Sequence, residues 1–232
     1  LNQNFKLCNR KYEFVKISPF PWDKLFKRSV LLNRRFEENL RFEDLLLVYS
    51  VLPCVNSIGV VDAPLYNYRK TNSGGFLNSF SEATLDIVSV FERLVEEHKK
   101  QGTYMDYYSE LEYLCIRHFF YRYENFFRRP KEKGKLDLKL KLIEDTIDFL
   151  EKQFPQWKNN HYLKYTAKRE LRENYDYYFS KKKIKRYVKM KQYMPKFLVK
   201  YYEKMRKVIQ KIRKHTWRDI CRKILSYFRK KK

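Results

Sequence analysis

The sequence is poor in glycine, in acidic residues and in long apolar runs, and each shortage excludes a class of protein. Only 5 of its 232 residues are glycine, whereas a turn-rich β fold needs glycine at its tight turns. Charged residues make up 34% of the chain, which suits long, solvated helices. Since 44% of the residues are hydrophobic, a chain of this length can still form a core. We therefore predict an α+β fold that is mostly helical.

No stretch of the sequence reaches the roughly 18 to 20 apolar residues that a helix needs to span a bilayer. The longest candidate, residues 45–61, is interrupted by Ser50, Pro53, Asn56 and Ser57. It predicts a buried helix that leads into a strand. No signal-peptide pattern is present either.

Cysteine is also rare, and its spacing indicates no metal or disulfide framework. The four cysteines lie far apart, form no C-x-x-C pair and have no histidine at metal-ligand spacing: Cys8, Cys54, Cys115 and Cys221. Reduced, structural thiols of this kind are typical of cytosolic proteins. We therefore expect a cytoplasmic location.

The shortage of acidic residues is concentrated at the C-terminal end. Residues 181–232 contain 22 Lys and Arg against Glu203 and Asp219, a net charge of +20 that leaves only +5 of the total +25 for residues 1–180. A codon-biased genome enriches Lys, Tyr and Phe throughout a chain but does not place charge so unevenly. The imbalance points to a polyanionic partner, either anionic lipid or nucleic acid.

The spacing of apolar residues divides the chain into an irregular part with strands and a helical part. Residues 1–42 are predicted to be irregular, and a short buried helix is predicted from residue 43 to residue 52. Two β-rich runs, 57–61 and 65–69, flank a tight connection, and a flexible loop follows at 71–75. Apolar residues at helical spacing then predict helices around 85–95, 111–119, 138–150 and 161–179, and a basic helical region from 181 with a break at Pro195.

The most informative stretch is residues 22–73, where four motifs follow one another before Ser73. They are Trp22-x-Lys24-Leu25-Phe26-Lys27, Phe36-Glu37-Glu38, Glu43-Asp44 and Pro64-Leu65-Tyr66-x-Tyr68-Arg69. This order and spacing resembles that of inverting family 2 glycosyltransferases with a GT-A fold from bacterial surface-polysaccharide pathways. The resemblance covers about residues 15–75, a third of the chain.

The resemblance implies three regions. Residues 1–75 would be the C-terminal part of a GT-A catalytic domain, residues 76–180 a helical domain and residues 181–232 a basic amphipathic helical tail. The implied reaction is non-processive transfer of one sugar from a nucleotide sugar to a lipid-linked saccharide, in capsule, exopolysaccharide or other surface-glycan synthesis. The implied location is the cytoplasmic face of the cell membrane.

The acidic pair is the implied catalytic group. The resemblance assigns Asp44, with Glu43 beside it, as the general base that takes the proton of the attacking acceptor hydroxyl. A helix N-terminus at this point is expected to keep the Asp44 carboxylate ionised. The alternative is that both acids only stabilise the start of a helix.

Four further residues are candidates for substrate binding. Trp22, with Lys24, either contacts the sugar or packs in the core. Arg69 either reaches the leaving diphosphate or is a surface arginine at a strand end. Ser73, in the loop that follows, is the fourth candidate. His118, on an apolar helical face, is interpreted as a core histidine.

Several motifs that the implied enzyme needs are missing from the sequence. Such enzymes bind the donor and Mg²⁺ or Mn²⁺ through an N-terminal half with an Asp-x-Asp element, and the sequence contains no Asp-x-Asp, no G-x-G-x-x-G and no P-loop. The chain starts with Leu1 rather than Met, and we expect a fragment of a longer enzyme that is inactive alone. The absence of Q-x-x-R-W favours addition of a single sugar.

The tail from residue 199 predicts a basic amphipathic helix that adsorbs to an anionic membrane. The residues expected at the membrane surface are Lys204, Arg206, Lys207, Ile209, Ile212 and Trp217. One alternative is a helix that docks its apolar side on the rest of the protein. Two others are a non-catalytic scaffold or membrane-docking module, and a nucleic-acid-binding protein, although no nucleic-acid-binding motif accompanies the charge.

Overall fold

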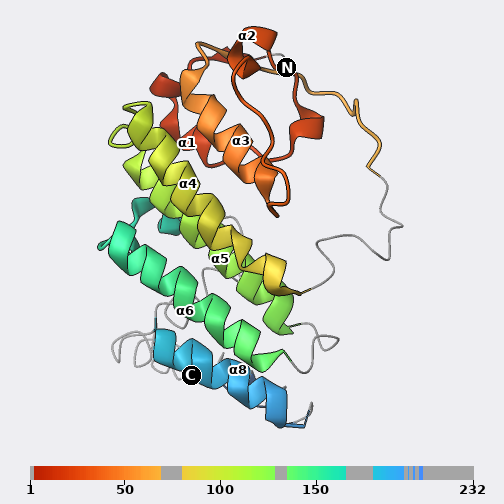
Figure 1. Ribbon diagram of the computed structural model, residues 1–232, viewed down its shortest axis with the longest axis vertical. Coiled ribbons are helices and arrows are strands. Elements are labelled where there is room, and N and C mark those ends of the chain that lie inside the picture. The colour runs from red at the N-terminus through yellow and green to blue at the C-terminus, as the bar shows by residue number, and fades with distance from the viewer. Residues whose placement is uncertain are drawn as a thin grey trace, which may run out of the picture. The chain divides into compact units, whose positions relative to one another are not determined.

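The computed structural model describes residues 3–68, 80–128, 135–165 and 180–195, together with positions 198, 201 and 204–205. The chain forms two compact units, Leu1–Lys185 and Arg186–Lys232. The described residues are mostly helical, with one small sheet, so the predicted α+β class with a majority of helix is confirmed (Figure 1). The boundaries predicted at residues 75 and 180 stay predictions.

The elements follow one another in a simple order, in which η denotes a 3₁₀ helix. They are β1 (Gln3–Phe5), η1 (Leu7–Asn9), α1 (Lys11–Phe14), η2 (Pro21–Asp23), α2 (Arg28–Leu31), α3 (Glu43–Val51), η3 (Leu52–Cys54), β2 (Ile58–Val60), η5 (Glu82–Thr84), α4 (Asp86–Lys100), α5 (Tyr108–Arg128), α6 (Leu136–Gln153), η7 (Trp157–Asn159), η8 (His161–Tyr165) and α8 (Lys181–Tyr193). Among the helices of the described residues, none combines the length and apolar character needed to cross a membrane.

The three long helices α4, α5 and α6 form the centre of the first unit, and all three were predicted from apolar spacing. Each buries one face, which on α4 includes Ile87, Phe91 and Leu94. The three helices contact one another, so the buried faces meet in a shared core, as amphipathic helices require. α6 ends at Gln153, before Pro155, as predicted.

The predicted short helix at residue 43 is confirmed as α3, which is buried along most of its length and packs against α4. Its N-cap is Phe42, whose φ of 70° and ψ of 28° lie in the left-handed region. A non-glycine residue in this conformation costs about 1–2 kcal/mol. The surrounding structure therefore has to hold Phe42 in place, and this strain lies directly beside the acidic pair.

Of the two predicted β-rich runs, the first contains the strand β2, whereas the described residues 65–68 of the second form no strand. β2 pairs antiparallel with β1, so that Asn4 lies opposite Gly59. A Cβ atom at residue 59 would lie 2.8 Å from Asn4 Oδ1, which explains why glycine suits this close approach. The N-terminal region, predicted to be irregular, thus supplies the partner strand.

Two other predicted segments lie wholly or partly outside the described residues. The loop at 71–75 is outside them, and of the helix predicted over 161–179 only residues 161–165 are described, as the 3₁₀ helix η8 rather than an α-helix. α8 ends at Tyr193, which agrees with the predicted break at Pro195.

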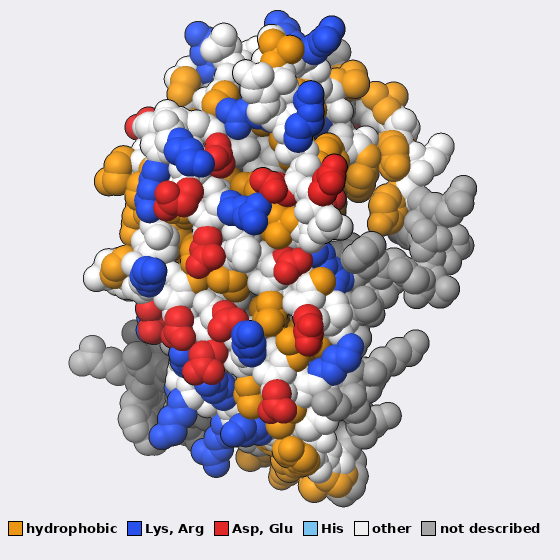
Figure 2. Space-filling model, viewed as in Figure 1, with side chains coloured by type: hydrophobic (Ala, Val, Ile, Leu, Met, Phe, Trp, Pro, Cys, Tyr) orange, Lys and Arg blue, Asp and Glu red, His pale blue; other side chains and the backbone are white. Residues whose placement is uncertain are grey.

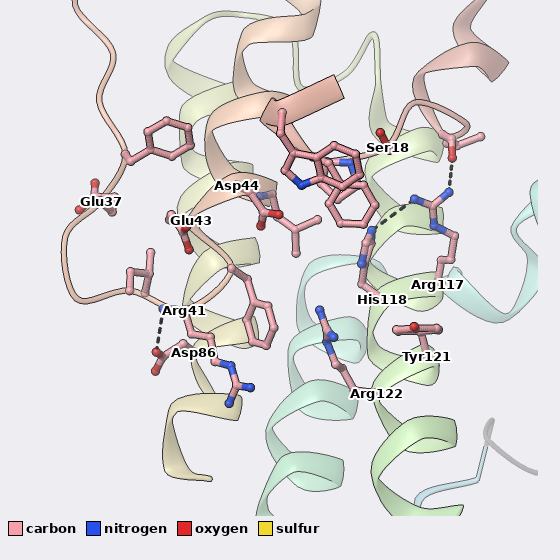
Figure 3. Close-up of a pocket in the computed structure, with 18 of the residues that line it drawn as sticks. Ser18, Glu37, Arg41, Glu43, Asp44, Asp86, Arg117, His118, Tyr121 and Arg122 are labelled. Atoms are coloured by element: carbon pink, nitrogen blue, oxygen red, sulfur yellow. Dashed lines mark hydrogen bonds between the residues drawn. The ribbon is translucent and has the colours of Figure 1, made fainter. Parts of the chain in front are cut away.

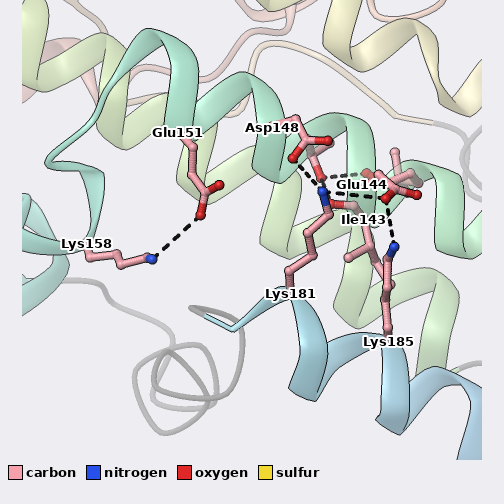
Figure 4. A network of polar contacts seen from close by, with 9 residues as sticks. Ile143, Glu144, Asp148, Glu151, Lys158, Lys181 and Lys185 are labelled. Carbon is pink, nitrogen blue, oxygen red and sulfur yellow. Dashed lines mark hydrogen bonds and ion pairs between the residues drawn. The ribbon is translucent and has the colours of Figure 1, made fainter.

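Charged side chains of both signs cover the face of the first unit formed by α4 and α6, where acidic and basic groups are interspersed (Figure 2). A small network ties the first residues of α8 to α6 (Figure 4). Lys181 Nζ lies 2.5 Å from Asp148 Oδ1, and Lys185 Nζ lies 2.9 Å from Glu144 Oε1. Exposed pairs of this kind contribute little free energy, but they engage two cations of the basic region with the protein's own carboxylates.

A buried histidine joins α4 to α3. His98 is fully buried, with Nε2 3.2 Å from the carbonyl oxygen of Tyr49 and Nδ1 2.9 Å from Thr103 Oγ1. Burial lowers the pKa of His98 from 6.5 to about 4. The folded protein therefore holds a neutral imidazole there at neutral pH.

We expect the free energy of unfolding to fall as the pH drops from about 6.5 to about 4. In this range the unfolded chain binds a proton at His98 that the folded chain does not, so stability rises with pH and is lost on acidification. A pKa difference of this size corresponds to roughly 3 kcal/mol when both states have titrated. Urea unfolding over a pH series measures the slope. His98→Gln keeps a hydrogen-bond donor for the carbonyl oxygen of Tyr49 and should make the free energy of unfolding depend less on pH. An unchanged pH dependence would assign the acid sensitivity to other groups.

Candidate functional site

A cavity of about 1730 Å³ opens in the first unit, lined by N-terminal loop residues, the start of α3 and the middle of α5 (Figure 3). Its lining contains aromatic residues (Tyr12, Phe20, Trp22, Phe36, Phe42, Tyr68, Tyr113, Tyr121, Tyr162), acidic residues (Glu37, Glu38, Glu43, Asp44, Asp86) and basic residues (Lys16, Arg41, Arg117, Arg122). Large aromatic surfaces with a few convergent charges are typical of a ligand site. The volume exceeds the usual range of about 300–1,000 Å³ for small-molecule pockets, which favours an extended ligand.

The cavity brings together several of the residues that the sequence singled out. Trp22, Glu43 and Asp44 all line it, as do Tyr68 and residues 36–38 of the second motif. Arg69 and Ser73 lie outside the described residues. The motifs between residues 22 and 68 thus meet at one place, although they are far apart in the sequence.

Trp22 lies in an aromatic stack on the rim of this cavity. Its ring centroid is 4.8 Å from that of Phe20 and 4.9 Å from that of Tyr66, both in stacked geometry, and 5.2 Å from that of Tyr68. Trp22 is 39% exposed, so the alternative that it packs in the core is wrong. A rigid, half-exposed aromatic surface of this kind is suited to stacking on the apolar face of a ligand ring.

Lys24, predicted to bind substrate, does not line the cavity. Its ammonium group forms an ion pair with Asp23 and donates to Ser18 Oγ at 3.0 Å and to the carbonyl oxygen of Phe20 at 2.9 Å. Ser18 Oγ in turn donates to Asp23 Oδ2 at 2.5 Å. These bonds close the loop around η2, so Lys24 positions Trp22 and makes no contact with the cavity itself.

Asp44 and Glu43 occupy the first turn of α3, and both are partly exposed. Asp44 Oδ1 accepts a hydrogen bond of 2.8 Å from the backbone N–H of Leu45. This bond supports the helix start, and the carboxylate keeps a second oxygen for other contacts. Both interpretations of the acidic pair, helix stabilisation and proton transfer, are compatible with this geometry.

The pKa of Asp44 differs from the sequence-based expectation. Burial raises the pKa of Asp44 above its ordinary value of 3.8, with a further increase from Glu43, and outweighs the lowering by the Leu45 N–H and by Arg122. The helix N-terminus was expected to favour the ionised form, and the Leu45 N–H does act in that direction, but burial has the larger effect on the pKa. A raised pKa brings a carboxylate closer to the range in which a general base works well near neutral pH.

Five cavity residues come from α5: Tyr113, Arg117, His118, Tyr121 and Arg122. Those that Figure 3 labels lie on the side opposite the acidic pair. Arg117 donates to the carbonyl oxygen of Val15, to Tyr49 Oη at 3.1 Å and to His118 Nε2 at 3.3 Å. Burial and the two neighbouring arginines, Arg117 and Arg122, lower the pKa of His118 well below 6.5. His118 is buried, as expected of a core histidine, but it also lines the cavity.

Sequence reasoning did not identify Arg122, although a signal was present. Residues 115, 118 and 119 lie on the buried face of α5, and position 122 continues this spacing of three and four residues. A cation at a position of an apolar stripe is rare unless it has a partner or a function. Arg41, in contrast, could not be identified from the sequence. It lies in an irregular segment, and no sequence pattern indicates the left-handed backbone of the next residue, Phe42.

The described residues do not fit the metal that the resemblance implies. Within the ranges that the structure describes, no group of three or more His, Cys, Asp or Glu side chains is arranged to hold a metal ion.

Comparisons with known proteins identify no relative: no protein-family model, curated protein or solved structure matches the chain. The resemblance to family 2 glycosyltransferases thus rests on the ordered motifs between residues 22 and 73.

Proposed function

We propose that the cavity is the acceptor side of an inverting, non-processive glycosyltransferase of the GT-A type. The observation that supports this most directly is that Trp22 and Asp44 line the same large cavity. One offers a half-exposed aromatic surface and the other a partly buried carboxylate with a raised pKa. An aromatic platform beside a base matches a ligand that has both apolar ring faces and reactive hydroxyl groups.

The reaction assigns a separate task to each group. The acceptor sugar stacks on Trp22 and directs one hydroxyl toward Asp44. As the hydroxyl oxygen forms a bond to the anomeric carbon of the donor, its proton passes to the Asp44 carboxylate, and the bond from the anomeric carbon to the diphosphate breaks with its electron pair. The diphosphate leaves with the negative charge. Arg69 is the residue that we expect to contact it.

The proposed partners follow from the same reaction. A nucleotide sugar is the donor, and a lipid-linked saccharide at the cytoplasmic face of a membrane is the acceptor. The donor and its metal would be bound by sequence outside this chain. The basic tail would hold the enzyme at the anionic surface where such an acceptor lies.

Saccharide binding by this chain tests the proposal without a donor. Ligand-observed NMR with a panel of neutral and N-acetylated disaccharides should detect binding, and Trp22→Ala should weaken it by roughly fivefold to tenfold. The reason is that an aromatic contact of this kind contributes about 0.5–1.5 kcal/mol beyond buried area. Leu25→Ala is the matched control, because Leu25 belongs to the same motif but is fully exposed and does not line the cavity. Equal affinities of the two variants, or no saccharide binding at all, would count against an acceptor site.

A further inference from the structure

The cavity contains a buried cation that no carboxylate of the described residues neutralises. Arg122 is only 6% exposed and lines the cavity. Within the part of the chain that the structure describes, no carboxylate forms an ion pair with Arg122, and its Nε has no hydrogen-bond partner. Its guanidinium lies over the ring of Phe42, 4.1 Å from the centroid, and 5.6 Å from that of Tyr121.

Such a position is unfavourable for an arginine. A guanidinium withdrawn from water loses its hydration, and contacts with aromatic rings restore only part of it. Burial and the charge of Arg41 lower the pKa of Arg122 to about 10, which still leaves it protonated at neutral pH. Arg41 and Arg117 line the same cavity, and so do five carboxylates of the described residues, but none of these forms an ion pair with Arg122.

Asp44 does not take the place of that anion. Asp44 and Arg122 come from different helices and face the same space (Figure 3), yet they form no ion pair. Arg122 does lower the pKa of Asp44, but burial outweighs this effect, so the two charges act on each other without a contact pair. The carboxylate and the guanidinium are therefore available to two different parts of one ligand.

We propose that Arg122 binds an oxyanion, a phosphate or a carboxylate group, carried by the saccharide that occupies the cavity. A guanidinium presents a planar fork of N–H donors that matches both groups. The acceptor is then an acidic or phosphorylated saccharide, whose anion is bound by Arg122 while a hydroxyl reaches Asp44. The identity of the carrier as a saccharide rests on the proposed function, and the oxyanion site rests on the cavity alone.

Thermal unfolding of the whole chain tests the site with defined probes at constant ionic strength. Glucose 1-phosphate, glucuronate and inorganic phosphate should each raise Tm in a saturable way, by about 5–10 °C at a hundredfold excess over Kd, whereas glucose and chloride should not. Arg122→Met should lose this response. Arg28→Met is the matched control, because it removes the same charge from an exposed position on α2 that does not line the cavity.

Stability without a ligand provides a second measurement. Arg122→Met keeps an unbranched side chain over Phe42 and removes the buried charge, so the ligand-free variant should have a Tm equal to or above that of the wild type. A lower Tm together with an unchanged anion response would show that Arg122 serves only the fold. Arg122→Lys keeps the charge without the fork and should bind the same probes several-fold more weakly.

The arms of the experiment separate the oxyanion site from the proposed function. A wild-type chain that shows no saturable response to any of the three anions overturns the site, whatever happens to the variants. If inorganic phosphate, glucuronate and glucose 1-phosphate all act through Arg122 with equal affinity, the oxyanion site stands and its assignment to a saccharide fails. Tighter binding of one sugar-linked anion supports both and identifies the group as phosphate or carboxylate.

Discussion

Asp44→Asn should lower kcat for sugar transfer about 10²–10⁴-fold and leave KM for both substrates nearly unchanged. A general base contributes this much to a transfer step, and asparagine keeps the size and the hydrogen bond from Leu45 while it loses the ability to accept a proton. The measurement is steady-state transfer by the longer enzyme of which we propose this chain to be a part. An accompanying thermal unfolding curve shows whether the fold is kept.

Glu43→Gln is the matched control for this prediction. It removes the same charge from the neighbouring residue of the same helical turn, which also lines the cavity, and should change kcat less than tenfold. Turnover close to wild type in Asp44→Asn, or an equal loss in both variants, would place the base elsewhere.

The pH dependence of sugar transfer is a second test of Asp44 as the general base. A base has to be ionised, so activity falls as the pH drops through its pKa, and burial moves this point above 3.8. Arg122 lowers the pKa of Asp44, so Arg122→Met should shift the acidic limb of the profile to higher pH. A residue that only stabilised the helix would give no such shift.

The long helices could be predicted because their burial is periodic along the sequence. On α4, Ile87, Phe91 and Leu94 are fully buried at a spacing of three to four residues, and no distant contact is needed to explain that pattern. The start of α3 was predicted for a similar local reason, since Glu43 and Asp44 stand directly before a buried run. Local signals therefore gave both the core helices and the position of the acidic pair.

The parts that could not be predicted depend on contacts between distant residues. β1 is only three residues long, too short to show alternation, and its pairing with β2 is settled by the fit of Asn4 against Gly59. The exposure of Trp22 depends on the hydrogen bonds by which Lys24 closes the loop around it. The apolar residues next to Trp22 in the sequence suggested core packing and gave no sign of this closure. Local sequence gives no measure of how closely such segments approach.

Removal of residues 196–232 should release the chain from vesicles that contain anionic lipid. The segment has 15 Lys and Arg against Glu203 and Asp219, a net charge of +13. Each basic residue near an anionic leaflet contributes about 1 kcal/mol, so half of them give roughly 7 kcal/mol, or a factor of about 10⁵ in partitioning. Its few described positions, among them Lys204 and Met205, are helical and exposed.

The first part of α8 provides a reason to cut at residue 196 and not before it. Lys181 and Lys185 already pair with Asp148 and Glu144 of α6, so they belong to the first unit and have less charge to offer a membrane. Truncation after residue 195 keeps these pairs. The loss of binding is then caused by the tail and not by damage to the first unit.

Flotation with phosphatidylserine-containing vesicles measures the effect, and binding should weaken as salt rises because exposed charges are screened within about 8 Å at physiological ionic strength. Replacing Ile209 and Ile212 by Asp removes the predicted apolar stripe as well as two units of charge. Gln210→Asp with Lys214→Gln changes the charge equally on the predicted polar face and should weaken binding less, since only the first pair removes buried apolar surface.

Two outcomes would overturn the membrane assignment. Equal loss in both double variants would leave a purely electrostatic tail, which a nucleic acid satisfies as well as a lipid surface, and a gel shift at matched salt would then decide between them. Full flotation of the chain that lacks residues 196–232 would place the anchor elsewhere. Binding that needs anionic lipid, falls with salt and depends on Ile209 and Ile212 requires both a charged surface and an apolar interior, and of the partners considered only a membrane offers the two together.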